Sequence, residues 1–237
     1  MKNIGFVIYA DKNLDNAIEI ANKLQDYTVV IANDRNGSDA KIKGKTLIYR
    51  DKQSYAACVN DGLRHLTQDG CEHLFILRDN IVINDLNFIQ PYIDTFLATG
   101  VHILFNNFDN TTMFDYSTLS VKLNDRFYKH LIYINKQCIK QIGYLDEKYK
   151  DSFEVLDYYY RLYNKGLCGP VGYFVSPNTP MVEEIKLENA VDINEDILLR
   201  GLKLFKHKYN YTPVELPILN MNEASQVFQK LFTRFVK

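Results

Sequence analysis

The chain has 237 residues, of which 46% are hydrophobic and 24% are charged, as in an ordinary globular protein. A net charge of −1 excludes a general electrostatic attraction to nucleic acid or to an anionic membrane. The apolar runs are too short for a signal peptide or a transmembrane segment, so we expect neither. Four scattered cysteines without a CxxC pair indicate reduced thiols in a cytoplasmic protein.

The first hundred residues alternate between strand and helix patterns. Continuous apolar runs predict buried parallel strands at Ile4–Tyr9, Thr28–Ala32, Thr46–Tyr49, His73–Leu77 and Val101–Asn106. Helical periodicity or runs of small residues predict helices at Asn13–Leu24, Ser54–Leu66 and Leu86–Ala98. The alternation predicts an α/β fold whose mostly parallel central sheet is flanked by helices.

The pattern loosens in the second half of the chain. A strand is predicted at Leu131–Asn135, and helices at Lys136–Ile142, Phe153–Gly166, Asp192–Tyr209 and Asn222–Val236. The last of these helices is amphipathic. We expect it to dock on its own domain or on a partner, a second copy included, rather than to bind a membrane peripherally.

Polar residues follow two of the apolar strands, at the edge where parallel sheets bind ligands. Asp34 can accept a hydrogen bond from a base or a ribose hydroxyl. Asp79 and Asn80 offer oxygen ligands to a divalent cation that would bridge a diphosphate. Taken alone, each of these turns is better explained as an ordinary surface turn.

Two carboxylates open the predicted helix Phe153–Gly166. Glu154 and Asp157 are three residues apart and therefore share one helix face. A carboxylate in such a place can serve sugar transfer as a general base. The alternative is that Asp151 and Glu154 form a capping-box-like pair that only starts the helix.

Several motifs of other enzyme classes are missing. There is no GxGxxG, no GxxxxGK[ST] and no GxSxG, which disfavours a dinucleotide-binding protein, a P-loop ATPase and a hydrolase of the nucleophile-elbow type. The five histidines do not have the spacing of a zinc site.

Taken in order, several segments resemble the family 2-like glycosyltransferases of GT-A fold, from Asn3 to Tyr209. The matching segments are VVIANDRNGSDA (Val29–Ala40, D-x-G-S-x-D), SYAACVNDGL (Ser54–Leu63), HLFILRDNIVIND (His73–Asp85, in place of D-x-D), INKQCIKQIGYLDEKY (Ile134–Tyr149, G-x-x-D-E), FEVLDYYYRLYNKG (Phe153–Gly166, E-D-x-D-x-x-x-R) and LFKHKYN (Leu204–Asn210).

The resemblance implies a single GT-A domain. Residues 1–105 would be a Rossmann-like half that binds the nucleotide sugar, residues 106–180 an acceptor half, and residues 181–237 a C-terminal helical extension. The implied activity is inverting transfer of a sugar from a nucleotide-diphosphate sugar, such as a UDP-sugar, to an acceptor hydroxyl. That hydroxyl would belong to a glycan, as in polysaccharide biosynthesis, to a lipid-linked saccharide or to a modified nucleobase; nucleic acid enters only as an acceptor.

The resemblance also assigns residue roles. Donor binding falls to Tyr9, Ala10, Asp11, Asp34, Asn60, Arg78 and Asp79. Asp79 and Asn80 would hold Mn²⁺ or Mg²⁺, and Glu154, or failing it Asp157, would be the base. The acceptor would lie near Asn106, Asn107 and Tyr158–Tyr160, although these tyrosines are equally well explained as core residues.

Two departures from the family pattern bear on these roles. The segment Arg78-Asp79-Asn80 replaces D-x-D, so the last metal-binding acid is a neutral amide. Arg78 would either sit beside the diphosphate and partly replace the metal, or turn away to pair with a carboxylate. Val155 stands where the family most often has its base. The alternative function is therefore a catalytically weak sugar-nucleotide-binding or scaffold subunit. A nucleotidyltransferase is disfavoured because Tyr9–Asn13 is not a Gly-rich basic loop.

Overall fold

The computed structural model describes residues 3–33, 46–49, 54–106, 130–150, 153–167, 173–175, 181–185 and 195–210. Every strand and helix predicted within these ranges is confirmed, with boundaries that shift by three residues or fewer. Asp34, Asn107 and the predicted helix Asn222–Val236 lie outside the described residues.

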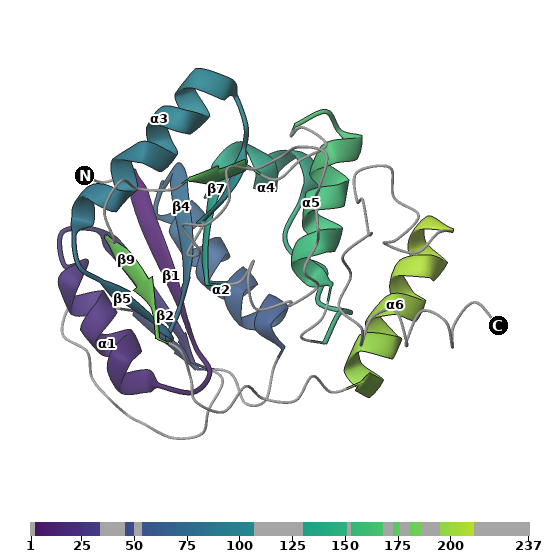
Figure 1. The fold of residues 1–237 in the computed structure, drawn as a ribbon, viewed down its shortest axis with the longest axis horizontal. Coiled ribbons are helices and arrows are strands. Elements are labelled where there is room, and N and C mark those ends of the chain that lie inside the picture. Colours follow the sequence, from purple (N-terminus) through teal and green to yellow (C-terminus); the bar gives the residue numbers. More distant parts are fainter. Residues whose placement is uncertain are drawn as a thin grey trace.

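The strands follow the apolar runs of the sequence (Figure 1). They are β1 (Ile4–Ala10), β2 (Thr28–Asn33), β3 (Thr46–Tyr49), β4 (His73–Arg78), β5 (Ile81–Ile83), β6 (Ile103–Asn106), β7 (Leu131–Asn135), β8 (Tyr173–Val175) and β9 (Val182–Glu184). Strands β5, β8 and β9, of three residues each, were not predicted from the sequence.

The helices carry local capping signals. They are α1 (Leu14–Lys23), α2 (Tyr55–Gln68), α3 (Ile89–Thr99, preceded by the 3₁₀ turn Leu86–Phe88), α4 (Lys136–Ile142), α5 (Glu154–Asn164) and α6 (Glu195–Tyr209). The side chains of Asn13, Ser54 and Asn135 each accept a hydrogen bond from a first-turn amide, of α1, α2 and α4 respectively. In the part of the chain that the structure describes, none of the helices combines the length and the apolar character needed to cross a membrane.

Seven of the described strands form one sheet in the order β3-β2-β1-β4-β7-β6-β8. Strand β7 runs antiparallel to both of its neighbours, and the other pairs are parallel. From β1 the chain moves outward to β2 and β3, then returns to place β4 on the other side of β1. This reversal makes the carboxyl ends of β1 and β4 the topological switch point, where ligands bind in open α/β sheets.

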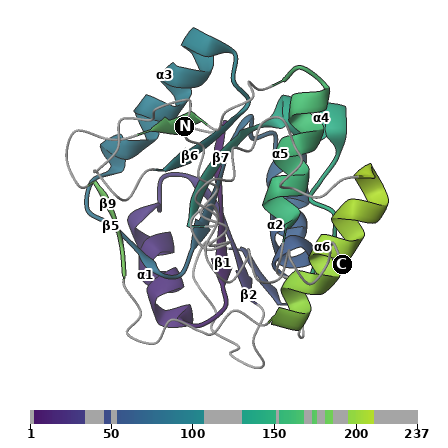
Figure 2. The ribbon, with the colours of Figure 1, turned by 45° about the vertical axis from the view of Figure 1, so that its right-hand side comes forward.

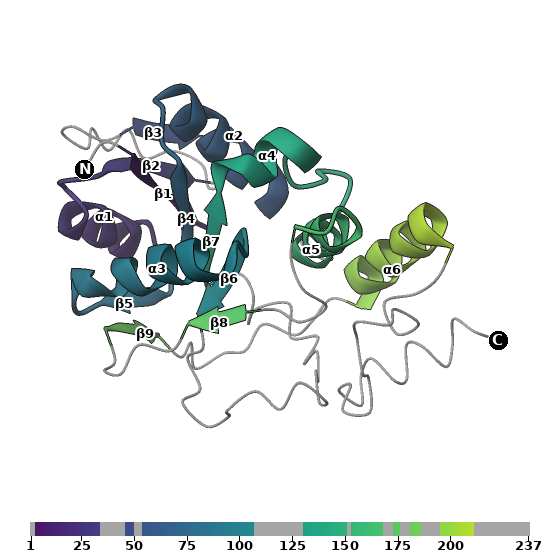
Figure 3. The same cartoon turned by 90° about the horizontal axis from the view of Figure 1, so that it is seen from above.

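Helices cover both faces of the sheet (Figure 2). On one face, Phe6 and Ile8 of β1 pack in a core shared with α1 and α3; on the other, Val7 and Tyr9 join α2, α4 and α5. Helix α6 lies outside α5, on the side away from the sheet (Figure 3). Helix α2 approaches β1 closely: a Cβ on Gly62 would lie 2.6 Å from Cγ1 of Val7.

Candidate functional site

The carboxyl ends of β1 and β4 bring together most of the residues predicted to bind the donor. Tyr9 pairs in register with Arg78, and the Asp79 amide continues the pairing by donating to the Tyr9 carbonyl at 3.1 Å. We call Tyr9–Asp11 together with Arg78–Asn80 the strand-end cluster. It lies at the switch point of the sheet, as the sequence predicted for polar turns after parallel strands.

Asp79 holds the loop that connects β1 to α1. Its Oδ2 atom accepts hydrogen bonds from three consecutive backbone amides, those of Asp11 (2.9 Å), Lys12 (2.6 Å) and Asn13 (2.6 Å). Asn16 of α1 donates to the backbone carbonyl of Asp79 at 2.7 Å. Asp79 is buried. One carboxylate oxygen therefore has its hydrogen-bonding capacity filled by the loop, which fixes the backbone at the strand end.

Arg78 lies across the cluster. Its Nη2 atom is 3.4 Å from Oδ2 of Asp11, and its guanidinium carbon lies 5.6 Å from the centre of the Tyr9 ring. The side chains of Arg78 and Asp11 are 19% and 29% exposed. The guanidinium thus stays partly accessible to solvent while a carboxylate and an aromatic ring orient it.

His130, which the sequence did not single out, completes this end of the sheet. It is buried immediately before β7, and its carbonyl accepts from the Arg78 amide at 3.0 Å. Its Nδ1 atom lies 2.8 Å from Oδ1 of Asn80. The sequence could not predict this contact, because His130 is not spaced from other histidines as in a metal site. Its position beside Asn80 arises only from the antiparallel pairing of β7 with β4.

The described residues do not fit the predicted Mn²⁺ or Mg²⁺ site. No group of three or more His, Cys, Asp or Glu side chains in the described ranges is arranged to hold a metal ion. Oδ2 of Asp79 is taken by three amides, and Oδ1 of Asn80 faces His130. Such dications are usually held by one or two protein carboxylates together with water and substrate phosphates, and here the oxygens that Asp79 and Asn80 would offer already have partners.

Asn60, predicted at the donor, contacts the loop that follows α4. Its side chain donates to the Leu145 carbonyl (2.9 Å) and to Oε1 of Glu147 (2.8 Å), and accepts from the Leu145 amide (3.0 Å). Arg64, one turn further along α2, also binds Glu147, at 3.0 Å. The hydrogen bond from Asn60, with the Arg64 pair, lowers the pKa of the Glu147 carboxyl. Asn60 therefore positions this loop.

The two predicted base candidates lie on α5, and both are fully buried. Glu154 is the first residue of the helix. Phe153, just before it, has φ of +60°, a backbone conformation that an aromatic residue rarely adopts. Such strain is often found beside functional residues. Val155, at the family's usual base position, is buried among apolar side chains.

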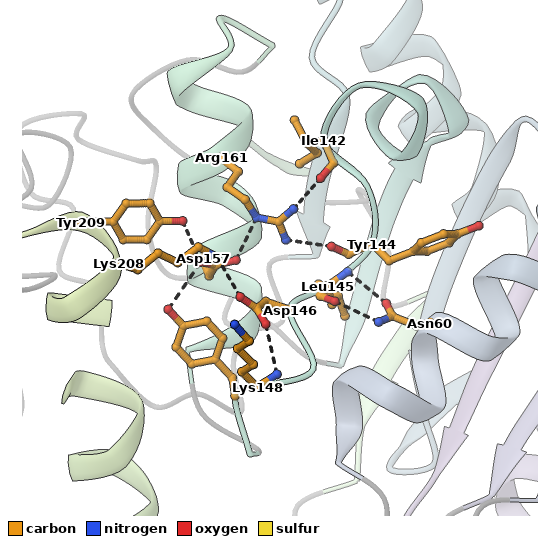
Figure 4. A network of polar contacts seen from close by, with 11 residues as sticks. Asn60, Ile142, Tyr144, Leu145, Asp146, Lys148, Asp157, Arg161, Lys208 and Tyr209 are labelled. Carbon is orange, nitrogen blue, oxygen red and sulfur yellow. Dashed lines mark hydrogen bonds and ion pairs between the residues drawn. The ribbon is translucent and has the colours of Figure 1, made fainter. Parts of the chain in front are cut away.

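Asp157 is the centre of a polar network that joins α5 to α6 (Figure 4). Its two carboxylate oxygens receive Nε of Arg161 (2.9 Å), Nζ of Lys208 (2.6 Å) and the hydroxyls of Tyr209 (2.7 Å) and Tyr149 (3.4 Å). Burial and the Asp157 charge raise the pKa of both tyrosines, so they remain hydrogen-bond donors.

The partners of Asp157 extend the network to the loop after α4. Arg161 donates to the carbonyls of Ile142 (2.6 Å) and Tyr144 (2.8 Å), as Figure 4 shows. Lys208 also binds Asp146 at 2.9 Å. Burial alone would raise the pKa of the Asp146 carboxyl, but the Lys208 ammonium and the hydrogen bond from the Lys148 amide together outweigh it and lower that pKa. Asp157 and its partners therefore connect α5, α6 and the loop after α4, and we call this the anchor role of Asp157.

The tyrosines of the predicted acceptor surface lie in the hydrophobic core. Tyr158, Tyr159 and Tyr160 are all buried in the core, which supports the packing interpretation of these residues. Asn106 ends β6.

No protein-family model and no curated protein matches the chain. Among solved structures, a mannosyltransferase from Pyrobaculum calidifontis, in complex with GDP-Man and Mn²⁺, superposes with a TM-score of 0.52 at 12% identity. The match covers 88% of this chain and 65% of that one, so the chain spans less than two thirds of the mannosyltransferase. The chain therefore shares the α/β fold of this mannosyltransferase.

Two other solved structures superpose less well. A protein described as a nucleotide-diphospho-sugar transferase from Desulfovibrio desulfuricans is 8% identical, with 99% of each chain covered and a TM-score of 0.45. A cytidylyltransferase from Leptospira borgpetersenii is 11% identical, with 100% of this chain and 96% of that one covered and a TM-score of 0.43. At these scores neither adds to the assignment. The mostly parallel sheet flanked by helices confirms the predicted fold class, and the narrower resemblance to family 2 stays a prediction.

Proposed function

We propose that this protein transfers a sugar, with inversion, from a nucleotide-diphosphate sugar to an acceptor hydroxyl. One observation carries the proposal. In a nucleotide-sugar transferase fold, Tyr9, Asp11, Arg78 and Asp79 meet at the switch point between β1 and β4, beyond the carboxyl ends of the strands.

The donor roles follow from the contacts in the strand-end cluster. The backbone of Tyr9–Asp11 would lie beneath the nucleoside, and Asp79 keeps the following loop in place through its three amide contacts. Arg78 is the cation of the strand-end cluster, and its guanidinium would stabilise the charge that develops on the leaving group. Asp34, outside the described residues, stays our proposal for reading the base or ribose. This mechanism uses no metal ion, because the side chains in the described ranges do not form a metal site.

We assign the base to Glu154 and not to Asp157. Both cations of the network and two tyrosine hydroxyls already bind Asp157. The Glu154 carboxylate would take the acceptor's hydroxyl proton while that oxygen attacks the anomeric carbon. The bond from carbon to diphosphate oxygen breaks, and its electron pair leaves with the nucleoside diphosphate. Because Glu154 is fully buried, acceptor binding must displace part of the chain around it.

A sugar-nucleotide-binding or scaffold subunit is the second candidate. It is favoured by the burial of Val155 at the usual base position and by the occupation of Asp157 as an anchor. Such a protein would bind a nucleotide sugar without turning it over.

Release of nucleoside diphosphate from a panel of UDP-, GDP-, dTDP- and CDP-sugars separates the two candidates. We expect the wild type to hydrolyse or transfer at least one donor. Glu154→Gln should lower kcat by about 10²-fold or more, as for loss of a general base. Glu19→Gln is the matched control, since Glu19 is 63% exposed on α1. A donor that raises the thermal midpoint but is turned over equally slowly by the wild type and by Glu154→Gln would identify a binding subunit.

A further inference from the structure

We propose that Arg78 takes the place of a divalent cation at the donor diphosphate, so that donor binding is independent of metal. This inference rests on the proposed function. The charge of the diphosphate would be neutralised at the strand-end cluster, where the oxygen atoms that could bind a metal ion lie.

Each carboxylate of the strand-end cluster already has a partner within the cluster. Oδ2 of Asp79 accepts from the amides of Asp11, Lys12 and Asn13 at 2.6–2.9 Å. Oδ2 of Asp11 faces the guanidinium of Arg78 at 3.4 Å. A cation that took Oδ2 of Asp79 would leave three consecutive, partly buried amides without this acceptor, which carries a cost in free energy.

The remaining groups of the cluster also disfavour a dication. Oδ1 of Asn80 lies 2.8 Å from Nδ1 of His130, so this carbonyl oxygen, too, has a partner. The Arg78 guanidinium stands on the adjacent residue with a fixed positive charge, which repels a second cation at the same point. A hard dication would therefore have to bind beside a permanent cation and compete for oxygens already in use.

Arg78 itself is suited to a diphosphate. Its side chain is 19% exposed, and the Tyr9 ring, 5.6 Å from the guanidinium carbon, orients it. The 3.4 Å contact with Asp11 is longer than the 2.7–2.9 Å usual for a charge-assisted hydrogen bond, and both side chains reach solvent. Such a pair exchanges easily for phosphate oxygens, which match the planar fork of the guanidinium in a bidentate manner.

Calorimetric titration of UDP, GDP, dTDP and CDP, each beside its monophosphate, tests the proposal on the full chain. The titrations are made once with EDTA and once with MnCl₂. We expect the best diphosphate to bind with dissociation constants that agree within about twofold in the two buffers.

Variants of Arg78 complete the test. Arg78→Gln should weaken the diphosphate by about tenfold or more, the loss of a charge-assisted hydrogen bond, and should weaken the monophosphate less. Arg78→Lys, which keeps the charge but not the fork, should fall between. Arg200→Gln on the exposed side of α6 is the control and should bind as the wild type does. Thermal midpoints in the absence of ligand establish that each variant is folded.

Two results would overturn the inference alone: diphosphate binding that appears only with Mn²⁺, or Arg78→Gln binding with wild-type affinity. If none of the nucleotides binds in either buffer, the proposed function fails and this inference fails with it.

Discussion

Asp157 is the side chain whose removal separates anchoring from catalysis most clearly. We consider Asp157→Asn, which keeps the size of the side chain and removes its charge. The carboxylate receives three hydrogen bonds of 2.9 Å or shorter, two of them from cations, and a longer one from Tyr149. Breaking a buried ion pair by removing one partner costs about 3–5 kcal/mol.

That cost is reduced here because the cations keep part of their hydration. Lys208 is 30% exposed and Arg161 is 20% exposed, so each can turn toward water once the charge of Asp157 is gone. The Asn carbonyl can still accept one or two of the hydrogen bonds. We therefore expect Asp157→Asn to lower the free energy of unfolding by about 2–4 kcal/mol, between the loss of one hydrogen bond to a charged group and the breaking of a fully buried ion pair.

Urea unfolding followed by far-UV circular dichroism measures this change. Lys208→Met removes one cation and should cost about 1 kcal/mol, since the lysine is partly exposed. Lys203→Met, an exposed lysine on the same helix, is the matched control and should change little. In the double variant, the cost of losing Lys208 should shrink, because its partner is already gone. If Asp157→Asn changed stability by less than about 0.5 kcal/mol yet abolished turnover, the anchor assignment would be refuted and Asp157 would be the base.

Three further variants test the surrounding structure. Gly62→Ala would place a Cβ 2.6 Å from Val7 and should lower the unfolding free energy by about 1–3 kcal/mol, less the gain in helix propensity; a more stable protein would contradict the close helix–strand contact. Asn60→Ala should cost about 1–3 kcal/mol, because it leaves the buried amide of Leu145 without its acceptor; protection of that amide against hydrogen exchange should fall with it. Folding lowers the pKa of Glu147, so the stabilisation by its carboxylate is fully present above the unfolded pKa and is lost as the pH falls through the folded pKa. The unfolding free energy of Glu147→Gln should therefore depend less on pH in the acid range than that of the wild type. An identical pH dependence would count against the pairing of Glu147 with Asn60.

The sequence predicted the sheet and its helices well because local signals determine them. Continuous apolar runs mark β1, β2 and β4, and the helical period marks α1. Strands β5, β8 and β9 went undetected because three residues cannot display a period. The antiparallel direction of β7 was equally hidden, since it arises only from pairing with β4 and β6.

The parts of the site that local sequence patterns determine could be predicted, whereas contacts between residues far apart in the sequence could not. Tyr9 and Arg78, which the resemblance assigns to donor binding, each lie at the end of an apolar run and come together because β1 and β4 pair in register. The role of Asp79 depends on loop amides 66 to 68 positions earlier in the chain, and no motif signals such a contact. Lys208 reaches Asp157 across 51 positions, a contact that no local pattern signals and that supports an anchoring role for the second of the two base candidates.

Hydrogen–deuterium exchange with and without a saturating nucleoside diphosphate tests the central claim most directly, namely that the donor binds at the ends of β1 and β4. The diphosphate would be the one that raises the thermal midpoint most. Bound ligand should slow exchange in peptides that contain Tyr9–Asn13 and Arg78–Asn80, with little change in α3, which packs against a face of the sheet through Ile89 and Tyr92. Slowed exchange confined to segments outside the strand-end cluster would contradict the proposed site.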